Sequence, residues 1–377
     1  MLYVLIGAGS IGRALIRDVL DADPKSRFLA VDSEDGALKA AAALDAKGGR
    51  VATKRAEATD PATLVPLLAG AAVVINCTFG ARCLEILDAA IAAKVPYIDV
   101  HGTLLMAERL ERHDAAKAAG IAALIGEGVS PGLTNMLAGY GARQFSGPVD
   151  IDCEYVTHRS INPTEGLLET ALRQFRDPVR VAVYENGEVT LHPPFSGVIH
   201  TRFKGLDEEI VLPYTPHSEP LTVPRYVPNA RRVVVRGTYH KDIMALMRAL
   251  SQFGLLNPDL EVTVNGRQEN FQPILRQALM GDGKPKPAGL QALYIMRVRV
   301  SDGTRSLEMT MGHKPGWDAA PQGRMTALPT AFAAQLVAHG EFAEKGICGP
   351  EQFSDEQVER CLSYLQARGL WLEKESR

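Results

Sequence analysis

The chain has 377 residues, of which 46% are hydrophobic and 23% are charged, and its 41 Lys and Arg residues nearly balance its 44 Asp and Glu residues. This composition excludes collagen-like and mostly disordered chains, and the length predicts two domains. Because no long run of one charge is present, the sequence lacks the surface typical of a nucleic-acid or membrane binder. We therefore expect a small-molecule partner.

Signals for membranes, secretion and metals are weak in this sequence. The apolar stretch 81–93 is interrupted by charges and is far shorter than the ~20 residues that span a bilayer. The first residues read as a strand rather than as a signal peptide. The five cysteines are widely spaced, without a CxxC pair or a cluster of zinc-ligand spacing. We expect a cytoplasmic protein without a structural metal or a disulfide framework.

The first third of the chain alternates short apolar runs with alanine-rich segments whose apolar residues recur at three- and four-residue spacing. The runs predict buried parallel strands at residues 2–6, 28–31, 73–76, 97–100 and 122–125. The segments between them predict helices at residues 11–22, 37–46, 81–93 and 106–119. This alternation predicts an α/β fold with a doubly wound parallel sheet.

From Val149 onward the pattern changes to alternating strands separated by Pro- and Gly-rich turns. Strands are expected at residues 151–157, 179–184, 231–236, 292–300 and 306–311, and helices at 241–253 and 268–281. Such a pattern is typical of an α+β domain with a mostly antiparallel sheet. Residues 281–289 predict a polar loop, and after Gly323 we expect helices to the end of the chain, one of them at 355–368.

A glycine-rich turn follows the first strand and opens the first helix. In Gly7-Ala8-Gly9-Ser10-Ile11-Gly12, the first glycine permits a tight turn, the second lets the backbone approach a pyrophosphate, and the third allows close packing of helix on strand. The alternative is a turn that binds nothing. Because strand, helix and a distant acidic residue all fit, we predict a Rossmann domain that binds a dinucleotide.

Asp32 decides which dinucleotide is expected. It stands 20 positions after Gly12, at the end of the second strand, where a carboxylate accepts hydrogen bonds from a ribose diol and repels a 2′-phosphate. Residues 33–36 contain no basic side chain, so NAD is predicted over NADP. Asp60 is expected either to border the adenine or to cap the helix that starts at Pro61.

Polar residues follow the later strands at the edge where a doubly wound sheet binds its ligands. These are Asn76-Cys77-Thr78, then Asp99-Val100-His101-Gly102, and then the turn at 126–135 with three glycines and a proline. Glycines let a backbone pass close to a ligand, so we expect this turn beside a nicotinamide ring. The predicted cofactor contacts are Gly7, Gly9, Ser10, Ile11, Gly12, Asp32, Asp60, Asn76, Cys77 and Thr78.

Several stretches together resemble the saccharopine dehydrogenase superfamily. They are the glycine-rich start, Tyr97-Ile-Asp-Val100, the helix end at 113–120 and Pro131-Gly-Leu-Thr-Asn135. Arg236-Gly-Thr-Tyr239, Phe253-Gly-Leu-Leu256 and residues 326–351 are similar to the lysine 6-dehydrogenase and saccharopine reductase branch. The resemblance implies a Rossmann domain at 1–133 plus 320–377, an inserted α+β substrate domain at 134–319, and a homodimer formed through the inserted sheet.

The resemblance also implies oxidation at a carbon attached to nitrogen, or the reverse reaction. Our first hypothesis is an NAD-dependent dehydrogenase of a basic amino acid such as lysine, acting through an imine. The second is a saccharopine-, opine- or carboxy-polyamine-type reductase that makes or splits a secondary amine. A thiol mechanism through Cys153 is a minor third, and a non-catalytic sensor of dinucleotide redox state is the alternative of another class.

Amine oxidation needs a base and an anchor for the substrate carboxylate. The candidate bases are Glu127, Asp99, His101 and His113. The non-catalytic alternatives are a solvated loop carboxylate for Glu127, a hydrogen-bonded imidazole for His101, and a surface side chain for His113. Arginine holds a carboxylate with two parallel hydrogen bonds, so the anchor is sought among arginines. The predicted substrate contacts are Arg159, which ranks above Arg173 and Arg202, with Arg236, Tyr239, Thr134 and Asn135.

Overall fold

The computed structural model describes the chain except residues 79–81, 159–164, 177–179 and 281–290. The described residues form two compact units. The first unit comprises Met1–Ser146, Arg225–Pro228 and Gly323–Gly369, and the second comprises Gly147–Pro224, Asn229–Gln322 and Leu370–Arg377. The chain therefore leaves the first unit after Ser146 and returns to it twice, at Arg225–Pro228 and at Gly323–Gly369.

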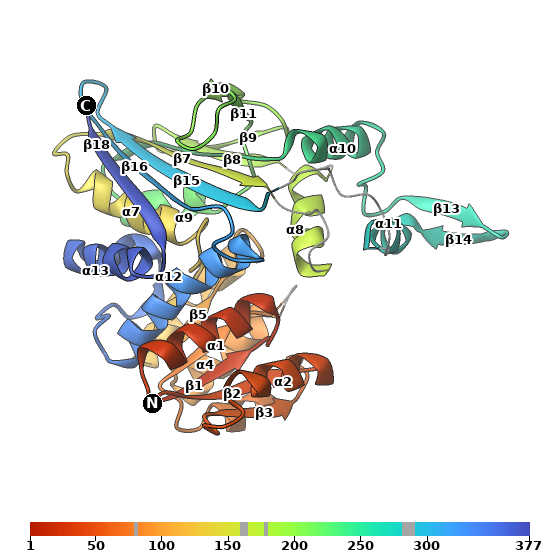
Figure 1. Cartoon of the computed structure of the whole chain (residues 1–377), viewed down its shortest axis with the longest axis vertical. Helices are drawn as coiled ribbons and strands as arrows, with labels where there is room; N and C mark the ends of the chain where they lie inside the picture. The colour runs from red at the N-terminus through yellow and green to blue at the C-terminus, as the bar shows by residue number, and fades with distance from the viewer. Residues whose placement is uncertain (79–81, 159–164, 177–179, 281–290) are drawn as a thin grey trace. The chain divides into compact units, whose positions relative to one another are not determined.

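The first unit is built on a parallel sheet of seven strands in the order β17-β6-β5-β4-β1-β2-β3 (Figure 1). The strand order reverses between β1 and β4, which is the point where doubly wound sheets bind ligands. The predicted α/β fold class is confirmed. The strands are β1 (Leu2–Ile6), β2 (Arg27–Asp32), β3 (Val51–Arg55), β4 (Val73–Asn76), β5 (Tyr97–Asp99), β6 (Ala122–Leu124) and β17 (Gly346–Cys348).

Helices connect these strands, and the predicted helix at 106–119 is two helices, α5 and α6, separated at Arg112. The helical elements are α1 (Ser10–Ala22), α2 (Asp35–Ala42), η1 (Ala43–Asp45), α3 (Pro61–Leu64), η2 (Val65–Leu68), α4 (Cys83–Ala93), α5 (Met106–Glu111), α6 (His113–Ala118), α7 (Leu133–Ala142), α12 (Pro321–Ala338), η3 (Pro350–Gln352) and α13 (Asp355–Gln366). Within the described residues, no helix is both long and apolar enough to cross a membrane.

The second unit is built on a mostly antiparallel sheet in the order β18-β16-β15-β7-β12-β8-β9, in which only β7 and β12 pair in parallel. Its strands are β7 (Val149–His158), β8 (Val181–Glu185), β9 (Glu188–His192), β12 (Ala230–Tyr239), β15 (Leu293–Ser301), β16 (Ser306–His313) and β18 (Leu370–Ser376). Two small hairpins accompany it, β10 (Ile199–Thr201) with β11 (Ile210–Leu212), and β13 (Glu261–Val264) with β14 (Arg267–Asn270).

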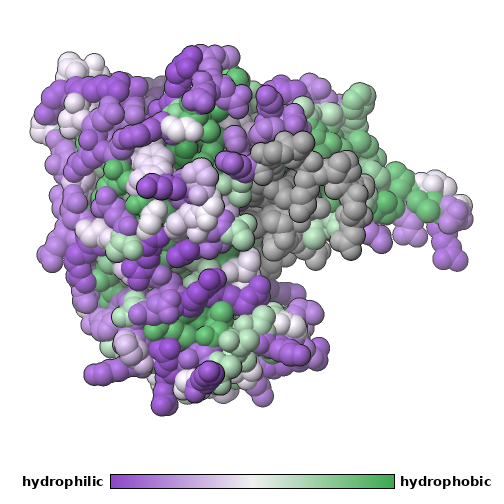
Figure 2. All heavy atoms as spheres, viewed as in Figure 1, coloured by the Kyte–Doolittle hydropathy of each residue, from purple (hydrophilic) through white to green (hydrophobic). Residues whose placement is uncertain are grey.

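Helices α8 (Glu165–Phe175), α10 (Lys241–Gln252) and α11 (Phe271–Met280) share a hydrophobic core in the second unit, and α9 (Glu219–Tyr226) leads out of it. Hydrophobic side chains also reach the surface around α10 and α11 (Figure 2). The helix predicted at 268–281 begins only at Phe271, because the residues before it pair as β14.

Two boundaries differ from those predicted. Helix α7 belongs to the first unit because it packs tightly on η3, where a Cβ on Gly139 would lie 2.5 Å from the carbonyl oxygen of Glu351. The end of the chain is not all helical, because β17 joins the first sheet and β18 pairs along its whole length with β16. The predicted loop at 281–289 lies outside the described residues.

Candidate functional site

The glycine-rich turn between β1 and α1 is tightly packed at Gly7 and Gly12 and unobstructed at Gly9. Gly7 has a φ of +96°, and a Cβ there would lie 2.5 Å from the carbonyl carbon of Cys77 at the end of β4. A Cβ on Gly12 would collide with the carbonyl oxygen of Gly7. At Gly9, by contrast, an added Cβ would meet no described atom within 4 Å. The backbone is thus accessible at Gly9, where α1 begins and its free N–H groups can bind an anion.

Asp32 ends β2 with its carboxylate held against this turn. One carboxylate oxygen accepts a hydrogen bond from the Ala8 N–H at 2.7 Å, and the other accepts one from the Glu34 N–H at 2.9 Å. Asp32 also lies opposite Arg55 in the pairing of β2 with β3. The Arg55 guanidinium pairs with exposed Asp35 at 3.4 Å. Inspection of residues 33–36 missed this arginine because it enters from the next strand.

The other predicted cofactor contacts lie in two places, at the end of β4 and at the start of α3. At the end of β4, the Asn76 side-chain oxygen accepts hydrogen bonds from the N–H and hydroxyl of Thr78, at 3.0 and 2.7 Å. Cys77 is half-buried there, and desolvation raises the pKa of its thiol to about 12. Asp60 lies at the start of α3, where its carboxylate caps the helix by accepting the Ala62 N–H at 2.9 Å.

Asp99 at the end of β5 forms a fully buried ion pair with Arg109 of α5, with a nitrogen–oxygen distance of 3.0 Å. The same carboxylate accepts hydrogen bonds from the N–H groups of His101 and Gly126, at 3.1 and 2.9 Å. Burial alone would raise the pKa of Asp99, but the positive charge of Arg109, together with these donors, holds it below its ordinary value. Asp99 therefore ties β5 to the turn after β6 as a charged group.

Arg109 was not among the residues predicted from the sequence, and its guanidinium also donates to the backbone carbonyls of His101 and Gly102. The one signal for Arg109 in the sequence is Asp99, because an acidic residue within a buried strand needs a cationic partner. The helical stretch around Arg109 reads as a charged surface segment, so the sequence did not indicate which cation would be buried.

The turn after β6 is held in place at both ends. The Glu127 N–H donates to the Asp99 carbonyl at 2.7 Å, and the Leu133 N–H donates to the Gly128 carbonyl at 2.7 Å. Gly132 has a φ of +124°, and a Cβ there would collide with the backbone of Gly128, so this position accepts only glycine. The turn is therefore a rigid connection that leads into α7.

The side chain of Glu127 is fully buried, and neither of its carboxyl oxygens has a hydrogen-bond partner among the described residues. Burial raises its pKa well above the ordinary value, and the negative charge of Glu351 raises it further. Glu351 accepts a hydrogen bond from the Asn135 amide at 2.7 Å, and the Asn135 oxygen accepts the Gly132 N–H at 2.9 Å. Thr134 is buried beside Asn135. Glu127 thus lies inside the first unit, where its carboxyl keeps its proton to higher pH than an exposed glutamate does.

The two candidate histidines occupy different places. His101 follows β5 and is 9% exposed, and its backbone is fixed on both sides by Asp99 and Arg109. His113 begins α6, and its Nδ1 lies 3.2 Å from the carbonyl oxygen of Ile347 in β17. Asp99 thus holds His101 close to Gly126. His113 lies at the edge of the sheet, because β17 is the edge strand.

In the second unit, Arg236 and Tyr239 lie on opposite faces of the sheet, because they are three residues apart on β12. The Arg236 guanidinium donates to Asp152 at 2.6 Å and to the Gly197 carbonyl at 3.0 Å. It also lies over the ring of Tyr214, 4.8 Å from its centroid. Arg236 is therefore bound within its own unit. Arg159 lies outside the described residues.

Tyr239 belongs to a buried polar cluster that was not predicted from the sequence. Its hydroxyl donates to the Gln174 side-chain oxygen at 2.8 Å, and the Gln174 amide lies 3.4 Å from the Tyr155 hydroxyl. The ring of Tyr155 stacks on Tyr294 with 5.9 Å between centroids. These residues come from four elements, so no local pattern connects them. Gln174 sits beside Arg173, whose guanidinium pairs with Glu169 at 3.1 Å.

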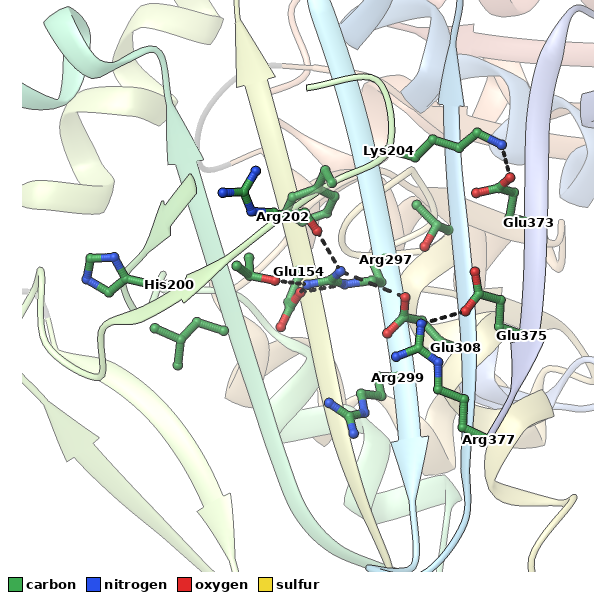
Figure 3. A pocket seen from close by; sticks show the side chains of 14 residues that line it. Glu154, His200, Arg202, Lys204, Arg297, Arg299, Glu308, Glu373, Glu375 and Arg377 are labelled. Atoms are coloured by element: carbon green, nitrogen blue, oxygen red, sulfur yellow. Dashed lines mark hydrogen bonds and ion pairs between the residues drawn. The ribbon is translucent and has the colours of Figure 1, made fainter. Parts of the chain in front are cut away.

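A charged pocket of about 490 Å³ lies on the other face of this sheet (Figure 3). Arg297 of β15 lies near its centre and donates to Glu154 at 2.8 Å, and Lys204 pairs with Glu373. Arg202, one of the candidate anchors, lines the pocket and donates to the Asp207 carbonyl at 3.4 Å. Because most charges here are already paired, the pocket gives no reason to place a substrate carboxylate in it.

Comparisons with known proteins agree with this geometry. Residues 3–124 match the saccharopine dehydrogenase NADP binding domain, and residues 128–370 match the saccharopine dehydrogenase C-terminal domain. The fold is similar to saccharopine dehydrogenase (L-Glu forming) from Saccharomyces cerevisiae, with a TM-score of 0.69 and 16% identity over 100% of this chain and 99% of that chain. It is also similar to homospermidine synthase from Legionella pneumophila in complex with NAD, with a TM-score of 0.67 and 11% identity over 100% of this chain and 92% of that one. Since the two matches together cover nearly all of it, the chain belongs to the saccharopine dehydrogenase family of NAD(P)-binding oxidoreductases.

Proposed function

We propose that this protein is an NAD-dependent oxidoreductase of the CH–NH bond of an amino acid, with a basic amino acid such as lysine as its substrate. The observation that carries the proposal is the open backbone at Gly9 beside the oriented carboxylate of Asp32. This arrangement suits a pyrophosphate at the start of α1 and a ribose diol at Asp32. When bound, NAD accepts a hydride from the carbon next to the amine nitrogen.

We assign the base to His101. Amine oxidation requires a neutral base that takes a proton from the substrate ammonium, and an imidazole performs this task near neutral pH. The hydrogen bonds of Asp99 and Arg109 fix the backbone of His101, so the residue is anchored at the carboxyl end of β5. The raised pKa and full burial of Glu127 favour a structural role for this side chain. Tyr239 and Arg159 are the proposed substrate contacts of the second unit.

A second candidate function is the formation or cleavage of a secondary amine. Both relatives carry names that refer to secondary amines, saccharopine and homospermidine. Such a reaction uses the same hydride transfer and the same base, and differs in a second substrate that condenses with the amine. We further propose that the protein is a homodimer.

The test is a screen of lysine, saccharopine, other amino acids and polyamines with NAD and with NADP, following the absorbance of the reduced nicotinamide. Turnover of lysine supports the first candidate, and turnover of saccharopine or a polyamine supports the second. If the protein binds NAD but turns over none of these compounds, the redox-sensor hypothesis replaces both.

His101→Asn then tests the base on the substrate that the screen identifies. Loss of general-base catalysis lowers kcat by ~10²-fold or more, whereas NAD affinity stays unchanged. His113→Asn is the matched control, because this histidine contacts β17 and should retain the wild-type kcat. Equal kcat values for His101→Asn and the wild type would show that another residue is the base.

A further inference from the structure

Four charged side chains of the second unit meet where α8 packs against α11 (Figure 1). Glu169, Arg173 and Arg176 follow one another at four- and three-residue spacing along α8 and the residue after it, so they share one side of the helix. Arg276 comes from α11. Buried apolar side chains of both helices, Phe175 among them, form a common core beside these charges. This core fixes the place where the charged groups converge.

Glu169 is the common acceptor of the three arginines. Its Oε1 atom accepts hydrogen bonds from Arg173 Nε at 3.1 Å and from Arg176 Nη2 at 3.2 Å, and its Oε2 atom accepts one from Arg276 Nη1 at 3.1 Å. The side chain of Glu169 is only 5% exposed. One buried carboxylate is therefore shared by three guanidinium groups that come from two helices.

This cluster carries three positive charges and one negative charge. An ion pair that only joins two helices needs one cation for its carboxylate, whereas three arginines this close repel one another, because a guanidinium keeps its proton. Among the residues that the structure describes, none of the three arginines pairs with a second carboxylate. The cluster thus has an excess of two positive charges that the described protein groups leave unbalanced.

The three guanidinium groups also have donors to spare. Each uses one nitrogen on Glu169. Arg176 Nε is buried, and no described group accepts a hydrogen bond from it, although a charged donor is rarely left unsatisfied in a protein interior. The side chains of Arg173 and Arg276 are 42% and 33% exposed, so solvent and solutes can reach their remaining nitrogens. The cluster is therefore open on the side where its charge is in excess.

We propose that Arg173, Arg176 and Arg276 bind a phosphate group, either the free ion or a phosphate monoester. A phosphate carries nearly two negative charges at neutral pH, which matches the excess charge of the cluster. Its oxygens accept paired hydrogen bonds from guanidinium groups. A single carboxylate brings one charge and two oxygens, which Glu169 already supplies. The inference goes beyond the proposed oxidation of an amine, because that reaction consumes no phosphate.

Arg173→Gln tests the site by calorimetry with inorganic phosphate, glycerol 3-phosphate and succinate, each against chloride at the same ionic strength. The variant should raise the Kd for phosphate by ~10-fold or more, the worth of a hydrogen bond to a charged group. Arg231→Gln breaks an exposed pair with Asp150 on the same sheet and should keep the wild-type Kd. Phosphate bound at the start of α1 is common to all these proteins, so the difference between them isolates the cluster.

The three ligands distinguish the possible sources of the anion. Binding of the free ion alone supports inorganic phosphate, and tighter binding of glycerol 3-phosphate supports a phosphorylated metabolite. Tighter binding of succinate than of either phosphate would overturn the assignment to phosphate. Equal Kd values for the wild type and Arg173→Gln, or no saturable binding by the wild type, would overturn the site itself.

Glu169→Gln gives a test with the opposite sign. It removes the negative charge that competes with the ligand, so the Kd for phosphate should fall by ~10-fold or more. Phosphate should then raise the melting temperature of this variant more than that of the wild type. If Glu169 only joined the helices, the variant would lose stability that phosphate does not restore, and an unchanged or higher Kd would overturn the proposal. Glu188→Gln, exposed on β9, is the matched control. These measurements use no NAD, so they leave the test of the reaction separate.

Discussion

At the scale of single residues, Glu127 shows how burial changes the role that is inferred for a charged residue from its place in the sequence. A charged residue in a glycine-rich turn suggested a base, but its carboxyl lies in the interior with Glu351 nearby. A glutamic acid there stays protonated at pH values where an exposed one is ionised. The same signal therefore marks a carboxyl with a raised pKa that packs inside the first unit.

The raised pKa of Glu127 predicts a pH-dependent stability. An unfolded glutamate releases its proton near pH ~4.3, whereas the folded one keeps it to higher pH. The stabilisation that Glu127 contributes is therefore full below ~4.3 and is lost by about 1.4 kcal/mol per pH unit as the pH rises toward the folded pKa. Glu127→Gln cannot ionise, so its free energy of unfolding relative to the wild type should increase from pH ~5 to ~7. Urea unfolding at several pH values checks this, with exposed Glu34→Gln as control, and parallel pH profiles for wild type and Glu127→Gln would refute it.

Asp32 predicts the cofactor preference. Replacing it with alanine removes the acceptor for the ribose diol and should weaken NAD binding by ~10-fold or more, the worth of a hydrogen bond to a charged group. Binding of NADP should change less, because the repulsion of its 2′-phosphate is also removed. Calorimetry with both nucleotides measures the effect, and Asp21→Ala provides an exposed carboxylate control at the far end of α1. Tighter binding of NADP than of NAD by the wild type would show that Arg55, rather than Asp32, dominates this end of the site.

At the scale of elements, the buried pair of Asp99 and Arg109 connects β5, α5 and the turn after β6. Arg109→Met removes the positive charge and leaves a buried carboxylate without its partner, which should cost about 3–5 kcal/mol of unfolding free energy. Adding Asp99→Asn to this variant should recover part of the loss, because the unpaired charge is then gone. Arg112→Met breaks the more exposed pair with Asp88 and should cost less than ~1 kcal/mol. Urea unfolding of the four proteins decides whether the pair is a structural tie, and equal losses for the two arginine variants would refute it.

At the scale of the whole molecule, the last strand ties the end of the chain to the second unit. In β18, Leu370 is buried, and Trp371 lies opposite Gly312, where a Cβ would come within 2.5 Å of the indole ring. Deletion of residues 370–377 uncovers β16 and should destabilise the second unit by ~2 kcal/mol or more, the worth of one buried leucine. Thermal unfolding measures the loss, and deletion of Arg377 alone should change little. NAD binding by the truncated chain reports on the first unit, and an unchanged melting temperature would contradict the role of β18.

Patterns within contiguous residues were sufficient for much of this protein. The spacing of apolar residues predicted most strands and helices, and the Gly7-to-Gly12 turn with Asp32 predicted the dinucleotide domain. Those signals are local because a strand, a helix start and a tight turn depend on neighbouring side chains and on the backbone freedom of glycine. Strands β3, β17 and β18, the edge strand β9 and the small hairpin strands β10, β11, β13 and β14 were not predicted. Strands β3, β9, β13 and β14 are mostly exposed, so no buried apolar run marks them in the sequence.

Only the tertiary structure decided which polar residues meet. Asp99 pairs with Arg109 across a loop, Asn135 contacts Glu351 from 216 residues away, and Tyr239 on β12 contacts Gln174 on α8. Exposure to solvent, which is low enough at Glu127 to raise its pKa and is 63% at Leu191, is likewise a property of the folded chain. Sequence fixes the residue types, but the strength of a charge or a hydrogen bond depends on its partner and its distance from water, and both arise from packing between distant segments.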